Sequence, residues 1–296
     1  YLFRGSGIIT NCVFRRNSGP TGAAFYTCAT DATYVDLLVY ANTGVNPPAY
    51  CGDNDIKYSD LGADWTKSPG NVLNRCTFAD NASRAPVVNQ GRAKKVIKNN
   101  VIDHEDLNFV MDTWLGGYDG TSGNNYWSLP GMLRYTNKNP RLNKFLRPSN
   151  ENVIADDAGV RIDNLPVAIP QTGRTVNVSN DEELAAAIAD IKDYDTIVLA
   201  PGTYTPASYT ISDKYGIDIY GSGSGAALDG NGMVTNTAPV FTFTDVYGLV
   251  ISNLTIAGVV KETLNSPIAF DFSRCGGARV NYVSITNCVM CPNATV

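Results

Sequence analysis

The chain has 296 residues, of which 44% are hydrophobic and 17% are charged, and it carries a formal net charge of −5 at pH 7. This length and apolar content allow a sizeable core in one or two domains. The acidic balance argues against a nucleic-acid partner, because the largest basic cluster is Arg92-Ala-Lys94-Lys95. No apolar run approaches the ~20 residues that a membrane-spanning helix needs, so no membrane span is expected.

Residues 1–127 contain pairs of short runs of β-branched and apolar residues, and a polar residue at an expected corner separates the two runs of each pair. The runs repeat in steps of 25, 39 and 24 residues when four positions are taken as equivalent: Phe14, Val39, Phe78 and Ile102. A period of roughly 20 to 25 residues is typical of a solenoid. The longest step contains a segment rich in Pro, Asp and Gly, from Gly44 to Gly70. We expect this segment to project as a loop from one corner.

The seven cysteines fit a secreted protein better than a zinc protein, because no Cys-x-x-Cys pair has a partner pair or a histidine nearby. Cys12 and Cys76 occupy the same place in their coils. We expect both to point inward among small apolar side chains, and Cys288 to do the same. A disulfide between Cys28 and Cys51 would pin the long loop, although spacing alone does not show it. Three sequons are candidate glycosylation sites: Asn81, Asn177 and Asn293.

Residues 128–173 carry five prolines and few strand patterns, which indicates an exit segment followed by a linker. A helix is then predicted at 180–191. Ser179-Asn-Asp-Glu182 has the spacing of a capping box, and one face of the helix is apolar, with Leu184, Ile188 and Ile191. In a solenoid, such a helix covers the first coil and hides an open strand edge. Residues 174–296 are therefore predicted to be the N-terminal half of a solenoid, and residues 1–127 the C-terminal half of one.

The segment from Val250 to Ile256 distinguishes a solenoid from a sandwich or a barrel. Apolar residues on both sides of Asn253 face one interior only if the chain bends sharply at this asparagine. Asn tolerates the left-handed conformation that a one-residue corner needs, and we expect the same corner at Asn11 and Asn287.

Two strands that meet at an Asn corner resemble a coil of the right-handed parallel β-helix in the pectin-lyase-like superfamily. The sequence segments 195–204 and 228–232 also resemble opening coils of that superfamily, and of alginate and chondroitin lyases in particular. The segments 139–142 and 155–159 resemble the closing segment of extracellular β-helix domains. The resemblance implies an all-β fold, with right-handed parallel β-helix (solenoid) segments and one capping helix of the N-terminal type. It implies little about activity, because the superfamily contains lyases, hydrolases, phage spikes and surface proteins.

The order of the two halves is inverted, and the word Ile-Thr-Asn-Cys-Val occurs twice, at 9–13 and at 285–289. Three accounts stay open. In the first, the chain is a segment of a tandem array of β-helix domains. In the second, its open end after Val296 stacks on the open end before Tyr1 of a second copy. In the third, common residues recur because every coil favours them. The chain has neither an initiator Met nor a signal peptide, so we expect a mature or excised piece.

No motif identifies a catalytic residue or a cofactor. The single histidine, His104, has no Gly-x-Ser-x-Gly elbow to accompany it. A lyase of this fold would need a basic residue to remove the proton beside a uronate carboxylate, and Ca²⁺ or Arg to neutralise that carboxylate. The candidate bases are Arg15, Arg84, Lys94 and Lys98, and the candidate calcium ligands are Asp53 and Asp55. Aromatic residues such as Tyr126 and Trp127 either stack on sugar rings or close the solenoid end.

These observations predict an extracellular or cell-surface protein with a structural or adhesive role, as a segment of a tandem array or a subunit of a head-to-tail filament. Its expected partners are copies of itself, joined through open β-helix ends, and extracellular polysaccharide. The alternative is a secreted polysaccharide lyase that acts on uronate-containing glycans, and a carbohydrate-binding module is a third reading. An enzyme should show a lateral groove where Lys or Arg and Asp converge.

Overall fold

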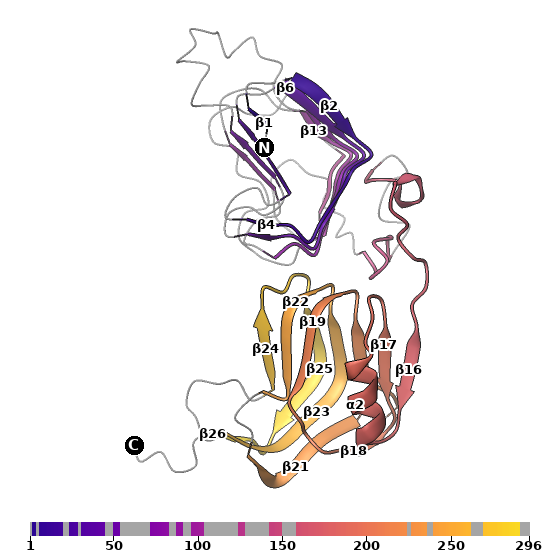
Figure 1. The fold of residues 1–296 in the computed structure, drawn as a ribbon, viewed down its shortest axis with the longest axis vertical. Coiled ribbons are helices and arrows are strands. Elements are labelled where there is room, and N and C mark those ends of the chain that lie inside the picture. Colours follow the sequence, from indigo (N-terminus) through magenta and orange to yellow (C-terminus); the bar gives the residue numbers. More distant parts are fainter. Residues whose placement is uncertain are drawn as a thin grey trace. The chain divides into compact units, whose positions relative to one another are not determined.

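The structure, a computed structural model, describes residues 2–3, 6–19, 24–28, 31–44, 50–53, 72–82, 87–90, 96–103, 124–127, 142–149, 158–223, 226–235, 239–261 and 269–290. The chain forms two compact units, Tyr1–Pro170 and Gln171–Val296. In each unit the strands pair in parallel and stack as successive coils (Figure 1). The predicted fold, parallel β-helix segments with one capping helix, is confirmed. No helix in the described part of the chain is long and apolar enough to cross a membrane.

The first unit contains parallel sheets whose strands come from successive coils. One sheet has the order β1-β5-β9-β12, from β1 (Leu2–Phe3), β5 (Phe25–Cys28), β9 (Tyr50–Asp53) and β12 (Val87–Gln90). The next has the order β13-β10-β6-β2, from β2 (Ser6–Thr10), β6 (Asp31–Val35), β10 (Val72–Asn74) and β13 (Val96–Lys98). The third has the order β15-β14-β11-β7-β3, from β3 (Val13–Arg15), β7 (Leu38–Tyr40), β11 (Thr77–Ala79), β14 (Val101–Asp103) and β15 (Tyr126–Trp127). The short strands β4 (Ser18–Gly19) and β8 (Thr43–Gly44) pair with each other.

The strand register confirms the repeat that the sequence predicted. Phe14 lies opposite Val39, Val39 opposite Phe78, and Phe78 opposite Ile102. These side chains belong to one core cluster, which Tyr34, Leu37 and Cys76 also join. Each coil therefore contributes one apolar side chain to the same interior column. Burial of the apolar surface of these side chains stabilises the stacking of the coils.

The segment from Gly44 to Gly70, predicted as a projecting loop, forms a strand in part. Its residues Tyr50–Asp53 make β9, which pairs with β5 on one side and β12 on the other. The loop prediction is therefore wrong for these four residues, because neighbouring strands supply hydrogen bonds that the local Pro and Gly content did not reveal. Residues 45–49 and 54–70 lie outside the described residues.

Each coil of the first unit turns on a single residue in the left-handed conformation. Asn11 has φ 53°, as predicted, and the equivalent residues in later coils also have positive φ: Asp36, Arg75, Asn99 and Asn124. Five residues further along, a second such corner occurs at Arg16, Ala41 and Asp80. The left-handed region is unfavourable for residues other than Gly. It is least unfavourable for Asn and Asp, because their side chains form hydrogen bonds with the nearby backbone. Tertiary stacking therefore holds arginine and alanine at corners that their own preferences disfavour.

Buried asparagines follow the first corner in the last two coils of this unit. Asn100 and Asn125 are fully buried, one above the other. Asn100 Oδ1 accepts from the N–H of Cys76 at 2.8 Å, and its Nδ2 donates to the Leu73 carbonyl at 3.1 Å and to Asn125 Oδ1 at 2.9 Å. Because its side-chain oxygen and nitrogen both have partners, this polar ladder can replace the apolar column formed by Leu37 and Cys76 in earlier coils.

A second buried ladder follows the other corner. Asn42 Nδ2 donates to the carbonyl of Phe14 at 3.1 Å and to Asn81 Oδ1 at 2.9 Å. Its own Oδ1 accepts from the N–H of Asn17 at 3.0 Å. These bonds join three successive coils, so the interior of the first unit is held by hydrogen bonds as well as by apolar burial.

We predict that Asn100→Leu destabilises the first unit even though leucine occupies the equivalent position in another coil at Leu37. The substitution leaves the Cys76 N–H, the Leu73 carbonyl and Asn125 Oδ1 without this partner, at a cost of about 2–3 kcal/mol. Chemical denaturation followed by circular dichroism measures the loss. An unchanged unfolding midpoint would show that the ladder contributes no net stability.

The second unit begins with β16 (Thr175–Val178) and the helix α2 (Asp181–Ala189), and its strands are β17 (Thr196–Leu199), β18 (Gly202–Tyr204), β19 (Tyr209–Tyr215), β20 (Asp218–Gly221), β21 (Ala226–Thr235), β22 (Phe241–Tyr247), β23 (Val250–Lys261), β24 (Phe270–Ser273), β25 (Arg279–Thr286) and β26 (Val289–Met290). The main sheet has the order β16-β17-β20-β23-β21-β18, with β25 and β26 also paired to β23. A second sheet has the order β19-β22-β24. Long strands such as β23 pass through a corner and so belong to two faces of the solenoid.

The predicted corners of the second unit are confirmed, since Asn253 has φ 54° and Asn287 has φ 52°. The repeated sequence Ile-Thr-Asn-Cys-Val forms a left-handed corner in both units, at Asn11 and at Asn287. The first coil of the first unit has two such corners five residues apart, Asn11 and Arg16, whereas the coil that ends the second unit has three, Gly277, Tyr282 and Asn287. The three accounts of the repetition therefore stay open.

The helix α2 covers the start of the second solenoid, as Figure 1 shows, where it lies against β16 and β19. Leu184, Ile188 and Ile191 are buried against the first coil, as predicted. The predicted capping box was one residue out of place. Asn180 is the N-cap and accepts from the N–H of Glu183 at 2.9 Å, while Glu183 Oε2 accepts from the N–H of Ser179 at 2.8 Å.

An arginine clamp joins the end of this helix to the first inner strand. Arg174 Nη1 donates to Asp190 Oδ2 at 2.7 Å, and its Nη2 donates to Asp195 Oδ2 at 2.6 Å. Asp195 is buried, and its Oδ2 also accepts from the N–H of Lys192 at 2.8 Å. Hydrogen bonds to Asp195 and Asp190 raise the pKa of Arg174, and the same contact lowers the pKa of Asp190. The clamp fixes the cap on the solenoid.

We predict that the helix cap weakens in acid through Glu183. Hydrogen bonds from Ser179 lower the pKa of the Glu183 carboxyl. Its stabilising contribution is therefore complete above the unfolded value of about 4.3 and is lost as pH falls through the lower folded value. The melting-temperature difference between the wild type and Glu183→Gln should shrink over that window. The matched control is Glu182→Gln, in the same helical turn, because Ser179 donates its described hydrogen bonds to Glu183, and equal pH profiles for the two variants would refute the assignment.

Candidate functional site

The structure describes two of the four predicted bases and does not bring them together. Arg15 is exposed on β3, and its Nη1 donates to Tyr40 Oη at 3.3 Å. Lys98 is half-buried on β13, on the other side of the corner and three coils further along. Neighbouring strands lie about 4.8 Å apart, so the two residues are separated by about 14 Å along the axis. Arg84 and Lys94 lie outside the described residues.

No group of three or more His, Cys, Asp or Glu side chains that could hold a metal ion occurs among the described residues. Asp53, a predicted calcium ligand, is the last residue of β9. Asp55 and His104 lie outside the described ranges, so calcium binding stays a prediction.

Tyr126 closes the solenoid and does not offer a platform to a sugar. Its side chain is buried, and its hydroxyl donates to Asn124 Oδ1 at 2.9 Å. The three candidate glycosylation sites differ in their exposure. Asn177 is exposed on β16, whereas Asn293 lies outside the described residues. Asn81 is buried and its Nδ2 donates to the Val39 carbonyl at 3.1 Å, so the ladder leaves no space for a glycan there.

The cysteines are structural where the structure describes them. Cys12 and Cys76 pack with the first core, and Cys288 packs with the second. All three carry free thiols, as does Cys275. The register gives no support to a Cys28–Cys51 disulfide, because Cys28 lies opposite Asp53 and Cys51 opposite Tyr26. Two residues of offset on neighbouring strands place the Cα atoms about 8 Å apart, beyond the usual disulfide range.

We predict that Cys76 resists alkylation in the folded protein. Burial raises the pKa of its thiol to about 12, so almost no thiolate forms near neutral pH. Peptide mapping after iodoacetamide treatment should show Cys76 unlabelled in buffer and labelled in denaturant. Labelling at the rate of a free cysteine in buffer would contradict the buried stack.

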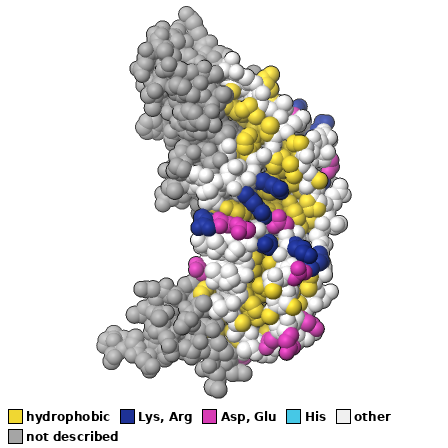
Figure 2. All heavy atoms as spheres, in the orientation of Figure 1, with side chains coloured by type: hydrophobic (Ala, Val, Ile, Leu, Met, Phe, Trp, Pro, Cys, Tyr) yellow, Lys and Arg dark blue, Asp and Glu magenta, His cyan; other side chains and the backbone are white. Residues whose placement is uncertain are grey.

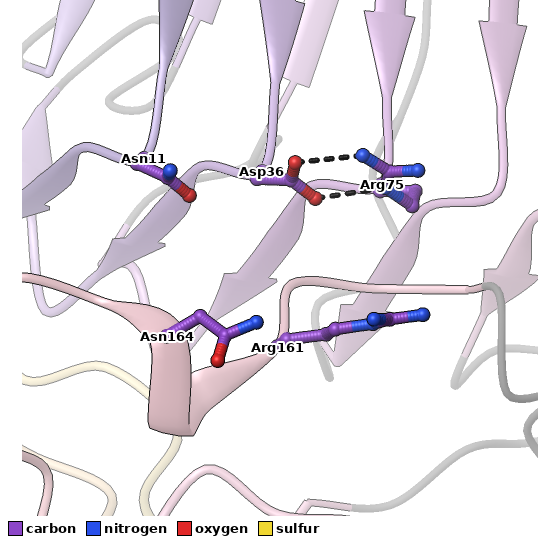
Figure 3. A pocket seen from close by; sticks show the side chains of 5 residues that line it. All are labelled: Asn11, Asp36, Arg75, Arg161 and Asn164. Atoms are coloured by element: carbon purple, nitrogen blue, oxygen red, sulfur yellow. Dashed lines mark hydrogen bonds and ion pairs between the residues drawn. The ribbon is translucent and has the colours of Figure 1, made fainter.

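A polar pocket of about 200 Å³ lies along the first corner row of the first unit. The corner residues Asn11, Asp36 and Arg75 form one wall, and Arg161 and Asn164 form the other (Figure 3). Arg75 Nε and Nη2 each donate to one Asp36 oxygen at 2.8 Å, which makes a bidentate pair between neighbouring coils. Figure 3 shows the Arg161 side chain running alongside this row.

The exit segment of the first unit builds the second wall. The N–H of Gly159 donates to the carbonyl of the corner residue Asn99 at 2.7 Å, and the N–H of Val160 donates to Thr77 Oγ1 at 3.0 Å. Gly159 has φ +73°, and an added Cβ would lie 2.8 Å from Val101 Cγ2, so only glycine fits this close approach. The tether sets Arg161, two residues further along, beside the corner row.

A short helix completes this wall. The 3₁₀ helix η2 (Ile162–Asn164) follows Arg161 directly, and it carries Asn164. On its outer side, Arg147 Nη2 donates to Asp163 Oδ1 at 2.6 Å and its Nη1 donates to the Pro170 carbonyl at 3.1 Å. The exit segment is therefore anchored on both sides of the pocket.

The pocket has an excess of positive charge. Two guanidinium groups, from Arg75 and Arg161, face one carboxylate, from Asp36, and the remaining lining groups are the amides of Asn11 and Asn164. Among the described residues, no carboxylate pairs with Arg161. Figure 2 shows several Lys and Arg side chains beside Asp and Glu side chains on the described surface. A guanidinium with open donors in a concave polar site is suited to a carboxylate.

Sequence reasoning missed this site. Asp36 and Arg75 occupy corner positions where an asparagine was expected, and opposite charges at equivalent positions of neighbouring coils could have indicated the pair. Arg161 could not have been found, because nothing in the local sequence places the exit segment against the corners.

No family model matches the chain, and no curated protein matches it significantly. Among solved structures, the chain is similar to the PL6 family alginate lyase AlyGC. One structure, of an AlyGC mutant, has 11% identity and a TM-score of 0.28, with 97% of this chain and 49% of that chain covered. Another, of AlyGC, has 14% identity and a TM-score of 0.22, with 97% of this chain and 46% of that chain covered. The chain spans about half the length of these structures.

Proposed function

We propose that the protein binds an acidic polysaccharide along the first corner row of its first solenoid, with one carboxylated sugar unit in the Arg75–Arg161 pocket. The observation that carries the proposal is the second guanidinium. Asp36 already satisfies Arg75 in a bidentate pair, whereas Arg161 has no carboxylate partner among the described residues. A polyuronate carboxylate supplies the missing acceptor.

The size and shape of the site suit one unit of a long chain. At about 200 Å³, the pocket is smaller than a typical drug-sized ligand site. It lies on a row of corners that repeats with each coil, so a polymer can continue along the solenoid past the pocket. Amides of Asn11 and Asn164 offer both donors and acceptors to sugar hydroxyls.

The same geometry favours binding over cleavage. Removal of the proton beside a uronate carboxylate needs a base within hydrogen-bond reach of the bound sugar. Among the residues that line the pocket, Arg161 binds the carboxylate in the proposed arrangement and Arg75 is engaged by Asp36, and the predicted bases Arg15 and Lys98 do not line it. A polysaccharide lyase remains the alternative, and it would require bases from outside the described residues.

The proposal keeps the protein in the extracellular class expected from its sequence, as a structural or adhesive β-helix protein at a polysaccharide-rich surface. The rigid, internally hydrogen-bonded coils suit a scaffold. The exposed sequon at Asn177 is compatible with secretion.

Binding of a polyuronate, measured by isothermal titration calorimetry, tests the proposal. Arg161→Gln should lower the affinity about tenfold or more, because it removes a charge-assisted contact without disturbing a described ion pair. Arg15→Gln removes the same charge from another exposed site on the same unit and should have little effect. A neutral polysaccharide should not bind.

Equal losses in the two variants would indicate diffuse electrostatic attraction and would overturn the pocket. Ultraviolet absorbance of an unsaturated sugar in the same mixtures would reveal β-elimination. Its appearance in the wild type and loss in Arg161→Gln would replace simple binding with the lyase alternative.

A further inference from the structure

The exit segment covers one of the two sheet faces that meet at the corner row. Thr77 and Val101 alternate with core residues along β11 and β14, so their side chains point outward, yet their exposures are only 4% and 2%. Gly159 lies against both side chains, and the N–H of Val160 donates to Thr77 Oγ1 at 3.0 Å. A ligand in the pocket cannot extend over this face, because the chain itself occupies it.

The face on the other side of the corners belongs to the sheet β13-β10-β6-β2. The outward row next to the corners lies in register through four coils, and it consists of Thr10, Val35, Asn74 and Lys98. Thr10 is exposed and the other three residues are half-buried. Each of them directly precedes a left-handed corner residue, so the row runs alongside the floor of the pocket.

Lys98 places a positive charge on this row, just past the pocket. It lies opposite Asn74, the residue before Arg75, and it is one coil further along the axis, a step of about 4.8 Å. Figure 3 shows the corner row running from Asn11 through Asp36 to Arg75, and Lys98 belongs to the next coil in that order. Among the described residues, no carboxylate pairs with its ammonium group.

Asn74 offers a polar contact between the pocket and Lys98. Its Oδ1 accepts from Asn99 Nδ2 at 2.9 Å, and Asn99 Oδ1 accepts from Asn124 Nδ2 at 2.8 Å. This outer row of amides holds the side chain of Asn74 in place, while its Nδ2 has no acceptor in the part of the chain that the structure describes. These N–H groups can donate to a sugar hydroxyl.

We propose that Lys98 binds the carboxylate of a second uronate unit, and that the polysaccharide leaves the pocket over the outward row Val35–Asn74–Lys98. This inference rests on the proposed function of the Arg75–Arg161 pocket, and it names the direction and the next contact of the same ligand. A polyuronate carries one carboxylate on every sugar, so the unit beside the one in the pocket needs a counter-charge of its own. Lys98 supplies that charge on the uncovered side of the corners.

Isothermal titration calorimetry with a short uronate oligomer tests the contact. Lys98→Gln should lower the affinity about threefold to fivefold, because it removes one partly exposed ion pair. Lys98→Arg retains the positive charge and should keep the affinity. Lys214→Gln is the matched control, because it removes the same charge from a half-buried lysine of the second unit, and it should bind like the wild type.

A gain of affinity tests the path independently of Lys98. Val35→Lys adds an ammonium group to the same outward row and should raise the affinity about twofold to fivefold at low salt, an effect that added salt reduces. Thr210→Lys adds the same charge at an exposed position on β19 of the second unit, and it should leave the affinity unchanged.

Coupling with a water-soluble carbodiimide gives a positional readout. The reagent activates a carboxylate of the oligomer and joins it, as an amide, to a lysine amine in contact with it. Peptide mapping should find the sugar on Lys98 and not on Lys214. Arg161→Gln should reduce this product, because the pocket then no longer holds the oligomer.

The outcomes separate this inference from the pocket. Weaker binding by Arg161→Gln, with wild-type affinity of Lys98→Gln and no coupling to Lys98, overturns the path and leaves the pocket in place. Wild-type affinity of Arg161→Gln overturns the pocket and, with it, this extension. Equal losses in Lys98→Gln and Lys214→Gln, or equal gains in Val35→Lys and Thr210→Lys, indicate diffuse electrostatic attraction and overturn the inference.

Discussion

The one-residue left-handed corner is the constraint on which this structure depends. A single residue forms the corner, so the alternation of inward and outward side chains on one side of it fixes the alternation on the other side. The same positions therefore face the interior in every coil. Asp36 in the first unit and Asn253 in the second place their neighbours in the same inward pattern. The corner costs energy for a residue such as Arg75 or Tyr282, and the parallel hydrogen bonds and buried columns on both sides compensate for it.

The interior shows how an all-apolar template accommodates polar residues. Asn100 replaces the small or apolar residue found at the same position in earlier coils, and it does so without leaving its side-chain oxygen or nitrogen unpaired. A side-chain amide has both a donor and an acceptor, so a stack of amides propagates along the axis in the same way as the backbone ladders. Asparagine is therefore suited to both the corners and the interior, for two different physical reasons.

The pocket is a consequence of stacking. At the corners, outward side chains from successive coils align, and this alignment brings Asp36 and Arg75 together although they are far apart in sequence. A solenoid thus presents repeated lateral rows for ligands.

The sequence by itself determined the fold class, the coil equivalences of the first unit, the corner asparagines and the apolar face of the capping helix. These features depend on local periodicity and on the conformational tolerance of Asn, which a sequence displays directly. Only the tertiary structure decided the strand at Tyr50–Asp53, the buried ladder at Asn81 and the position of Arg161 beside Arg75. Each of these depends on which coil lies above or below, and a stacking neighbour about 25 or more residues away leaves no local signal in the sequence.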